Sequence, residues 1–408
     1  MQVNLNGKTI LLGVTGSISA YKACDIARLF VKAGADVHIV MTASAERFVS
    51  ALTFEALTRN TVLTDATESW SSELNHIDIG KKCDAFVIAP ATANTINKLR
   101  HGIADNILTQ TALAYTKEII IAPAANTNML LNHATKDSIN SLRSNGYTLI
   151  EPQDKLLACG DTGSGALAEP LEVFYATAKA LLKESFWEDR EVVVTGGGSR
   201  EKIDEVRYIS NFSSGKMASA LSLALYLKGS NVTYISTMGF GDLPLDIKRV
   251  EVESAEDILQ ETQKNITAVT TQESEAIPYL FMVAAVADFK PVDPKDGKVK
   301  KSSVGTHWSI ELEQTADVLA TINKSKIKTV GFKAEMDSQE GLNNAVALLE
   351  KKGVDAVCYN LLDDAKSFGG SDNEITFITK EKQVPLGRTD KLTLATKIID
   401  QAKGLING

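Results

Sequence analysis

Two stretches of the chain share one pattern of hydrophobic and polar positions. In the first, an apolar run at residues 9–14 meets a Gly/Ser turn, and the helical pattern that follows places Ile26, Leu29, Phe30 and Ala33 on one face. The segment AGAD then ends the helix, and VHIVM forms a second apolar run. This order of strand, helix and strand predicts a βαβ unit.

The same plan returns in the second half of the chain. An apolar run at residues 192–195 leads into GGGS, a helical pattern covers about 215–228 after a longer insert, and VTYIS is the next apolar run. Two such beginnings imply two domains, which a length of 408 residues also favours. The polar, helical stretch AKALLKESFWEDR lies between them and places the boundary near Phe186–Asp189, which gives domains 1–188 and 189–408.

Further continuous apolar runs alternate with helical patterns in both halves. They lie at residues 84–91, 118–126, 279–289, 329–335 and 355–360. Runs of this kind are typical of parallel strands that are covered on both faces, so the predicted fold class is α/β, with two Rossmann-like domains. Residues 375–387 are expected to form a hairpin at a sheet edge. Ligands of such sheets bind beyond the carboxyl ends of the strands.

Composition and charge exclude several functions. A net charge of −8 argues against broad binding to nucleic acid or to acidic membranes. No apolar run reaches the ~18 residues that a membrane span needs, and the N-terminus lacks the pattern of a signal peptide. The four cysteines, at positions 24, 83, 159 and 358, show neither a CxxC pair nor a zinc-site spacing. We therefore expect a reducing, cytoplasmic location.

Small and polar residues lie at the ends of two apolar runs of the N-terminal half. Gly16, Ser17 and Ser19 lie at a strand-to-helix turn, where backbone N–H groups and hydroxyls bind phosphate, although the spacing is not GxGxxG. A tight turn with a helix cap explains them equally well. The apolar run at residues 84–91 contains Pro90 and is followed by Thr92, Asn94 and Thr95, and these four residues are suited to a phosphate or an isoalloxazine edge. Helix capping explains one of these four, not all of them.

Three further residues of this half are candidates for chemistry. Asn126 ends another apolar run, where an Asx turn is the alternative interpretation. His76 lies in a polar loop and is either structural or a base near neutral pH. Cys159 precedes glycines at 160, 163 and 165, so it is either a small apolar residue or a reactive group under a loop that closes.

Five motifs of the N-terminal half resemble the flavin-dependent cysteine decarboxylases. They are GVTGSISAYK, NHI, PATANT, APAANTNM and LACGDTGSGALA. The resemblance implies a flavodoxin-like domain that binds FMN in a homo-oligomer, with Thr42 joining the cofactor-binding residues named above. It also implies that the thiol side of a cysteine-derived substrate is oxidised before CO₂ leaves. His76 then matches a base, Asn126 the residue that binds the substrate carboxylate, and Cys159 the acid that completes the reduction.

The C-terminal half carries the residue types of an anion site. Gly196, Gly197 and Gly198 allow a close approach of the backbone to phosphate. The segment SNFSSGK places several donors at a helix N-terminus: Asn211, Ser213, Ser214, Gly215 and Lys216. Asp288 ends an apolar run, where a carboxylate needs a cation or a metal ion. Lys298 belongs to a lysine run that neutralises a triphosphate or is a solvated loop.

The same segments, with AAVADFKP, KVKK and GFKAE, resemble phosphopantothenate–cysteine ligase. Over the whole chain, the two resemblances match the fused bacterial enzymes of coenzyme A biosynthesis. They imply that CTP activates 4′-phosphopantothenate as an acyl-cytidylate, with Mg²⁺ offsetting charge, before cysteine displaces CMP. Asn211, Arg207 and Lys298 match residues of that chemistry. The implied nucleotide contacts add Ala285, Asp288, Thr315, Ala316, Asp317, Val318, Phe332 and Lys352. Trimers of the first domain and dimers of the second are implied, without nucleic-acid or membrane partners.

The sequence departs from the family at four positions. Ala125, Leu130 and Ala166 replace a methionine, a tryptophan and an arginine that are usual in the decarboxylases, and Leu348 stands where a lysine is usual in the ligases. An alternative is therefore an active ligase whose first domain binds FMN and assembles the oligomer but is catalytically impaired. A regulatory binding protein and a decarboxylase of peptide C-terminal cysteine are two others, and both leave the ligase motifs unexplained.

Overall fold

The chain folds into two compact units, Gln2–Leu182 (the N-terminal unit) and Lys183–Gly408 (the C-terminal unit). The computed structural model describes residues 1–156, 162–271, 275–336, 338–361 and 369–406. The division falls at 182/183 rather than at the predicted 188/189. The intervening residues pack into the C-terminal unit, because Glu184 contacts Lys228 and Lys403 and the Trp187 ring lies 5.0 Å from the Tyr279 ring.

A five-stranded parallel sheet forms the centre of the N-terminal unit, in the order β2-β1-β3-β4-β5. Its strands are β1 (Thr9–Val14), β2 (Asp36–Met41), β3 (Ala85–Ala91), β4 (Ile119–Pro123) and β5 (Thr148–Leu149). The predicted run at 118–126 is thus a strand only as far as Pro123. The chain passes from β1 to β2 on one side and then returns past β1 to β3 on the other, so the strand order reverses between β1 and β3. Sheets of this order bind ligands at that point.

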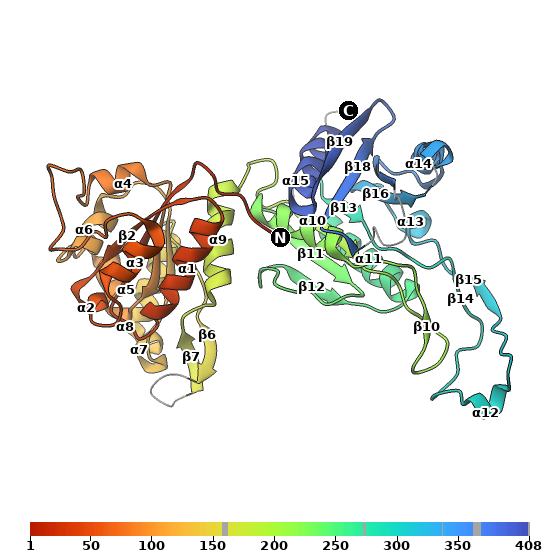
Figure 1. Cartoon of the computed structure of the whole chain (residues 1–408), viewed down its shortest axis with the longest axis horizontal. Coiled ribbons are helices and arrows are strands. Elements are labelled where there is room, and N and C mark those ends of the chain that lie inside the picture. The colour runs from red at the N-terminus through yellow and green to blue at the C-terminus, as the bar shows by residue number, and fades with distance from the viewer. Residues whose placement is uncertain (157–161, 272–274, 337, 362–368, 407–408) are drawn as a thin grey trace. The chain divides into compact units, whose positions relative to one another are not determined.

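Helices cover both faces of this sheet (Figure 1). One face carries α1 (Ala20–Lys32), α3 (Ala51–Thr58) and α9 (Pro170–Leu182), and the other carries α5 (Ala93–His101), α6 (Ile107–Ala114) and α8 (His133–Ser144). Shorter helices are α2 (Ala43–Glu46), α4 (Asp78–Lys82) and α7 (Thr127–Leu131). Successive strand residues face opposite helix layers. Leu11, Phe86 and Ile121 face one of them and pack into the core beneath α5 and α6. A separate ribbon pairs β6 (Gln153–Leu156) with β7 (Thr162–Ala166).

An eight-stranded sheet forms the centre of the C-terminal unit, in the order β12-β11-β8-β13-β16-β17-β18-β19. The parallel part is β8 (Glu191–Gly196), β11 (Asn231–Ser236), β12 (Lys248–Glu251), β13 (Tyr279–Met282), β16 (Lys328–Glu335) and β17 (Ala356–Leu361). The predicted edge hairpin is present as the antiparallel β18 (Asp372–Ile378) and β19 (Gln383–Asp390).

Two helix layers again enclose the sheet. On one face α10 (Lys216–Leu227) packs against α15 (Lys391–Ala402), which continues into a 3₁₀ turn at Lys403–Ile406, and the other face carries α11 (Ala255–Thr270), α13 (Val318–Thr321) and α14 (Ser338–Lys352). The fold class predicted from the sequence is therefore confirmed in both units. No helix in the described part of the chain has both the length and the apolar character to span a bilayer.

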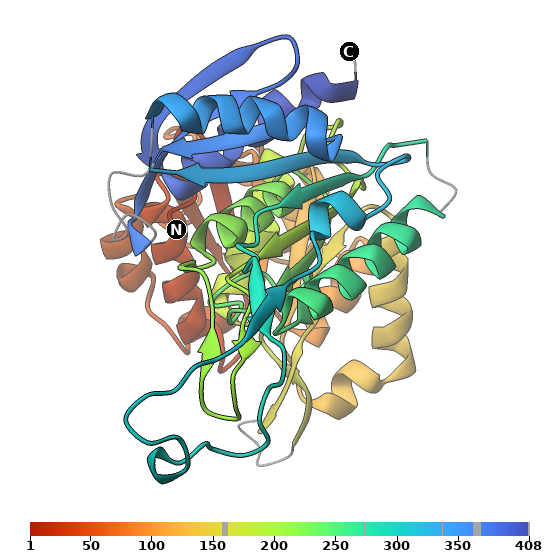
Figure 2. The same cartoon turned by 90° about the vertical axis from the view of Figure 1, so that its right-hand side faces the viewer.

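One excursion leaves the C-terminal sheet (Figures 1 and 2). It comprises residues 288–314, called the arm here, with the ribbon of β14 (Phe289–Pro291) and β15 (Leu312–Gln314) at its base and α12 (Lys301–Val304) further out. A second ribbon, β9 (Glu201–Lys202) with β10 (Tyr208–Ile209), lies beside it, and the backbone forms a parallel β-bridge between Asp204 and Lys295.

The predicted strand at 279–289 is too long. Strand β13 ends at Met282, because the next two N–H groups, of Val283 and Ala284, donate to the Thr195 hydroxyl instead of continuing the ladder. Asp288 is exposed in the loop that follows. The expectation that its carboxylate ends a buried strand, and therefore requires a compensating cation, is wrong.

Candidate functional site

The N-terminal unit has a cavity of about 550 Å³ beyond the carboxyl ends of its strands. The turns after β1, β2, β3 and β4 all contribute to its wall. Six of the residues predicted to bind a cofactor line it: Gly16, Ser17, Thr42, Thr92, Asn94 and Thr95. Ser19 and Pro90 are not among the lining residues. A volume in this range suits a cofactor-sized ligand.

Thr15 joins two of these turns. Its buried hydroxyl donates to the Pro90 carbonyl at 2.7 Å and accepts from the Thr92 N–H at 3.1 Å. Thr92 in turn caps α5 through the Thr95 N–H, and Thr42 caps α2 through the Ala45 N–H. Thr92 and Thr42 therefore cap helices and also line the cavity, because a helix cap fixes the turn that forms the cavity wall. Helix capping and cofactor binding are compatible roles for these residues.

Gly16 is a glycine because another turn occupies the space of a side chain. A Cβ at this position would lie 2.4 Å from Ser44 Cβ and 3.1 Å from the Ser44 backbone. The turn after β1 and the turn after β2 can approach closely only when Gly16 has no side chain. This contact sets the width of the cavity on one side.

Several charged or polar residues of this cavity were not predicted from the sequence. Lys98, on α5, forms an ion pair with Asp105 at 2.7 Å, and Asp65 accepts from the Ile107 N–H at the start of α6. Asn106 donates to Asp105 and also caps α6. They lie outside the quoted motifs: Lys98 follows PATANT on α5, Asp105 and Asn106 lie in the loop before α6, and Asp65 comes from a segment 40 residues before Asp105.

His76 lies outside this cavity. It precedes α4, and its ring Nδ1 lies 2.6 Å from Glu68 Oε1. The Trp70 ring meets the imidazole edge-on, with centroids 5.6 Å apart. His76 is therefore tightly placed, but the structure of a single chain does not bring it to the predicted flavin residues.

Asn126 lies at the edge of the same rim. It caps α7 by accepting from the Asn128 N–H, so the predicted Asx turn is present. The ribbon β6–β7 leans on this segment, since the Ala125 N–H donates to the Gly165 carbonyl at 3.1 Å. Gly163 and Gly165 leave room for Thr127 and for the Ala125 carbonyl, so close packing explains these two glycines. Cys159 lies between β6 and β7 in the sequence and is outside the described residues.

Burial raises the thiol pKa of each of the three described cysteines. The shift takes Cys83 to about 12, and the pKa values of Cys24 and Cys358 are also raised from their usual value. A raised pKa disfavours the thiolate, so these three side chains serve packing.

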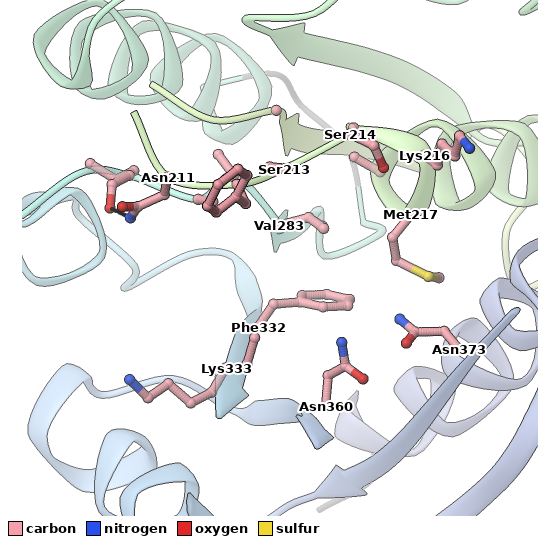
Figure 3. Close-up of a pocket in the computed structure, with 18 of the residues that line it drawn as sticks. Asn211, Ser213, Ser214, Lys216, Met217, Val283, Phe332, Lys333, Asn360 and Asn373 are labelled. Carbon is pink, nitrogen blue, oxygen red and sulfur yellow. Dashed lines mark hydrogen bonds between the residues drawn. The ribbon is translucent and has the colours of Figure 1, made fainter. Parts of the chain in front are cut away.

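The C-terminal unit has a cavity of about 500 Å³, also beyond the carboxyl ends of its parallel strands (Figure 3). Gly197 follows β8, residues 283–286 follow β13, Phe332 belongs to β16 and Asn360 to β17. The start of α10 completes this wall. Predicted residues that line it are Gly197, Asn211, Ser213, Ser214, Gly215, Lys216, Ala285, Asp288 and Phe332.

The glycine triplet serves several close contacts. A Cβ on Gly196 would lie 2.5 Å from Ala218 Cβ, and one on Gly198 would lie 2.5 Å from the Asn211 carbonyl oxygen. Gly197 has φ +84°, a conformation that favours glycine, and its carbonyl accepts from the Ala285 N–H. Only Gly197 lines the cavity, so Gly196 and Gly198 act by bringing α10 and the Asn211 segment to the rim.

Donors gather at the helix N-terminus as predicted. The Asn211 amide donates to the Val286 carbonyl at 2.9 Å, which ties the two walls of the cavity together. Lys216 is the first residue of α10 and donates to the Gly369 carbonyl at 2.8 Å. A cation and free helical N–H groups at one point favour a phosphate.

Among the lining residues that were not predicted are the polar side chains of Asn360, Asn373 and Lys391. In the view of Figure 3, Asn211 and Asn373 lie on opposite sides of Phe332. Lys391 is only 7% exposed, and burial, with Lys216 nearby, lowers its pKa. Asn360 is the last residue of the predicted apolar run at 355–360, so its position at the rim could have been predicted. Asn373 and Lys391 could not, because the antiparallel strand β18 and the start of α15 bring them to this rim.

The predicted turn at residues 315–318 lies beside the cavity and does not line it. The Thr315 N–H donates to the Asp288 carbonyl at 3.0 Å, so the turn is attached to the loop that carries Asp288. Asp317 caps α13 and contacts Lys352. The side chain of Val318 is buried in the core, which leaves its backbone as the group available to a ligand.

Arg207 and Lys298 lie at the arm, away from the lining of the cavity. Arg207 contacts the buried carboxylate of Asp204, donates to the Val299 carbonyl at 3.0 Å and lies 4.5 Å from the Trp308 ring centroid. The Arg207 hydrogen bond lowers the pKa of Asp204. Within one chain, Arg207 therefore anchors the arm.

Asp288 is the predicted metal ligand. It is an exposed carboxylate at the rim, and among the described residues no three His, Cys, Asp or Glu side chains gather as a metal site. One carboxylate suits Mg²⁺ that arrives with substrate phosphates, since protein sites often supply only one or two ligands to this ion.

Two family models divide the chain between them. The model described as Flavoprotein matches residues 1–182, and the DNA/pantothenate metabolism flavoprotein C-terminal domain matches residues 187–405. The two matches correspond to the two compact units.

Curated relatives match the chain from end to end. It is 34% identical over 404 residues to the coenzyme A biosynthesis bifunctional protein CoaBC of Haemophilus influenzae, with 98% of each chain covered. It is 38% identical over 411 residues to the protein of that name from Bacillus subtilis, again with 98% of each covered. Identity to the Mycobacterium tuberculosis CoaBC is 34% over 412 residues, with 96% of each covered. The family predicted from the motifs is confirmed, and this chain belongs to the CoaBC family of bifunctional coenzyme A biosynthesis enzymes, in which a decarboxylase is fused to a ligase.

Proposed function

We propose that the C-terminal unit joins cysteine to 4′-phosphopantothenate with CTP and Mg²⁺, and that the N-terminal unit decarboxylates the product with FMN. The end-to-end match to fused relatives carries this proposal. It is supported by two separate cavities, each at the carboxyl ends of a parallel sheet and each lined by anion-binding groups.

The N-terminal cavity fits FMN. Its hydroxyl, amide and backbone donors at Gly16, Ser17, Thr42 and Thr95 suit a phosphate, and its volume suits the rest of the cofactor. When bound, FMN supplies the oxidation that gives the electrons of the breaking C–CO₂ bond a sink. The chain's own residues hold the ring and exclude water.

Three residues are assigned to the decarboxylation itself. His76 takes a proton from the substrate, Asn126 holds its carboxylate, and Cys159 returns a proton at the end of the cycle. Because His76 lies outside the cavity of its own chain, we assign the complete site to a homo-oligomer in which copies meet at this rim, as trimers of the N-terminal unit.

In the C-terminal cavity, the carboxylate of 4′-phosphopantothenate attacks the α-phosphorus of CTP, and pyrophosphate leaves. The cysteine amine then attacks the acyl carbon, and CMP leaves. Lys216 and the α10 N-terminus hold phosphate, Asn211 holds the acyl group, and Asp288 contributes to a Mg²⁺ carried by the nucleotide. We assign Arg207 and Lys298 to a site completed by dimers of this unit.

One set of incubations tests both halves. The purified protein receives 4′-phosphopantothenate, cysteine, Mg²⁺ and each nucleoside triphosphate in turn, and products are followed by mass. We expect phosphopantothenoylcysteine with CTP, and then 4′-phosphopantetheine. No product with any triphosphate would contradict the ligase assignment.

A second incubation distinguishes an active decarboxylase domain from the alternative in which this domain binds FMN but is catalytically impaired. Phosphopantothenoylcysteine is supplied without CTP, and CO₂ is measured. Release of CO₂ by a yellow protein is expected; a yellow protein that releases none would show that the first half is a flavin-binding scaffold, in line with Ala125, Leu130 and Ala166.

A further inference from the structure

The carboxylate of Glu68 holds the ring of His76. Glu68 Oε1 lies 2.6 Å from His76 Nδ1, and the His76 backbone N–H donates to the same oxygen at 3.4 Å. The side chains are 24% and 23% exposed, so water competes only in part for this contact. Two contacts from one residue fix the imidazole in both position and rotation.

The backbone around Glu68 is also fixed. The Glu68 N–H donates to the Thr64 carbonyl at 3.1 Å, in a turn attached to the sheet where Leu63 bridges Val40. The Ser69 N–H donates to the Leu74 carbonyl at 2.8 Å and closes the loop between the two partners.

The loop is anchored on the far side of His76 as well. The buried Asn75 side chain accepts from the N–H groups of Ile77 and Asp78. Glu68 and His76 are therefore presented to each other by folded structure on both sides, rather than by two long side chains that meet in solvent.

We propose that Glu68 is a positioning residue for decarboxylation, which selects the tautomer of His76. An ionised carboxylate only accepts hydrogen bonds, so the proton of the neutral ring must lie on Nδ1. Nε2 then carries the lone pair and is the nitrogen that accepts a proton from substrate. Trp70, edge-on to the ring, restricts its rotation further. This inference rests on the proposed role of His76 as a base.

Substitutions distinguish this role from simple packing. Glu68→Gln keeps the shape but lets the amide donate to Nδ1, which frees the ring to adopt the other tautomer. We expect kcat for phosphopantothenoylcysteine to fall roughly 10–100-fold with KM unchanged, since Glu68 acts through another residue. Glu68→Asp, which keeps the carboxylate, should retain more activity than Glu68→Gln. Unchanged kcat in Glu68→Gln, or the reverse order of the two variants, would overturn the proposal.

Glu73→Gln is the matched control. Glu73 is an exposed acid of the same loop, so its replacement removes the same charge without touching His76. This variant should keep wild-type kcat, and all variants should retain bound flavin. A loss in Glu73→Gln equal to that in Glu68→Gln would mean that the charge of the loop, rather than the contact with His76, matters.

A measurement without turnover keeps the inference separate from the proposed function. The full chain is labelled with ¹⁵N-histidine, and His76 is assigned among its five histidines with a His76→Gln variant. The ¹⁵N chemical shifts of His76 should indicate the Nδ1–H tautomer in the wild type and a mixture of the Nδ1–H and Nε2–H tautomers in Glu68→Gln. An Nε2–H tautomer in the wild type refutes the inference even if the enzyme is active. The expected tautomer with no CO₂ release would show that Glu68 selects the tautomer of His76, but would refute the decarboxylation that this selection serves.

Discussion

The two cavities occupy the same place on two sheets but are built differently. The N-terminal cavity is lined mainly by the turns that directly follow four parallel strands, together with helix α5 and the loop before α6. The C-terminal cavity adds Asn373 and Lys391, which an antiparallel strand and the following helix return to the rim. A parallel sheet therefore supplies a binding rim from local turns, and an added hairpin brings in residues from far along the chain.

The two units agree in another respect. In each, predicted binding residues line the cavity, whereas some residues expected to take part in chemistry do not: His76 in the first unit, and Arg207 and Lys298 in the second. Asn211, which is also expected to take part in the ligase chemistry, does line the second cavity. The following predictions perturb one unit or one contact at a time, beginning with the largest expected effect.

Lys216→Met should affect only the second cavity. Loss of the cation at the α10 N-terminus removes a charged hydrogen bond to phosphate, and such bonds contribute about 1.5–3 kcal/mol, or roughly 10–100-fold. We expect kcat/KM for CTP to fall by that factor in the ligase assay, while CO₂ release from supplied phosphopantothenoylcysteine is unchanged.

Lys380→Met, at an exposed lysine of the same unit, provides the comparison for that variant. It should leave both activities as they are. If Lys216→Met lowered both activities equally, the two sites would not be independent.

Gly16→Ala should affect only the first cavity. The new Cβ would lie 2.4 Å from Ser44 Cβ, and overpacking of this kind costs about 1–3 kcal/mol. We expect flavin affinity to fall roughly tenfold or more, measured by titration of the apoprotein with FMN, with ligase activity retained. Adding Ser44→Gly should restore part of the affinity; a double variant no better than Gly16→Ala would contradict the proposed clash.

Thr15→Val tests the buried hydroxyl that joins two turns. The change removes the bonds to the Pro90 carbonyl and the Thr92 N–H, at a cost of about 1–3 kcal/mol in the free energy of unfolding of the N-terminal unit. This loss of stability should appear as faster hydrogen exchange of the amides in β1 and β3, measured as a function of urea concentration. Thr53→Val, on the exposed face of α3, should leave that exchange unchanged.

Asp204→Asn should have the smallest, most local effect. Because the Arg207 hydrogen bond lowers the pKa of Asp204, the ionised carboxylate stabilises the arm above the unfolded pKa of about 3.9, and that stabilisation is lost as pH falls through the folded value. The variant should mimic acid at neutral pH and speed hydrogen exchange at Val206, Arg207 and Val299, whose N–H groups donate to this side chain. The control Asp293→Asn loses only an exposed contact with Lys295, and it should leave hydrogen exchange at those three residues unchanged.

Much of the fold could be predicted from the sequence because its signals are local. Most of the strands were predicted from continuous apolar runs, and the residues at the ends of these runs supplied six predicted lining residues of the first cavity and nine of the second. The error at Asp288 arose because the apolar run continues past Met282, whereas the strand stops where the Thr195 hydroxyl captures the next two N–H groups. The Thr195 side chain, 88 residues before Val283 in the sequence, decided that end.

The sequence by itself determined the two α/β units, their order and the residue types at each sheet rim, since strand and turn preferences act over a few neighbouring positions. Only the tertiary structure decided which of those residues share a cavity. In the folded units, Lys391 and Lys216 line the same cavity, His76 lies against Glu68, and Arg207 contacts the arm. These placements depend on packing between segments that are distant in the sequence, and local sequence patterns do not predict such contacts.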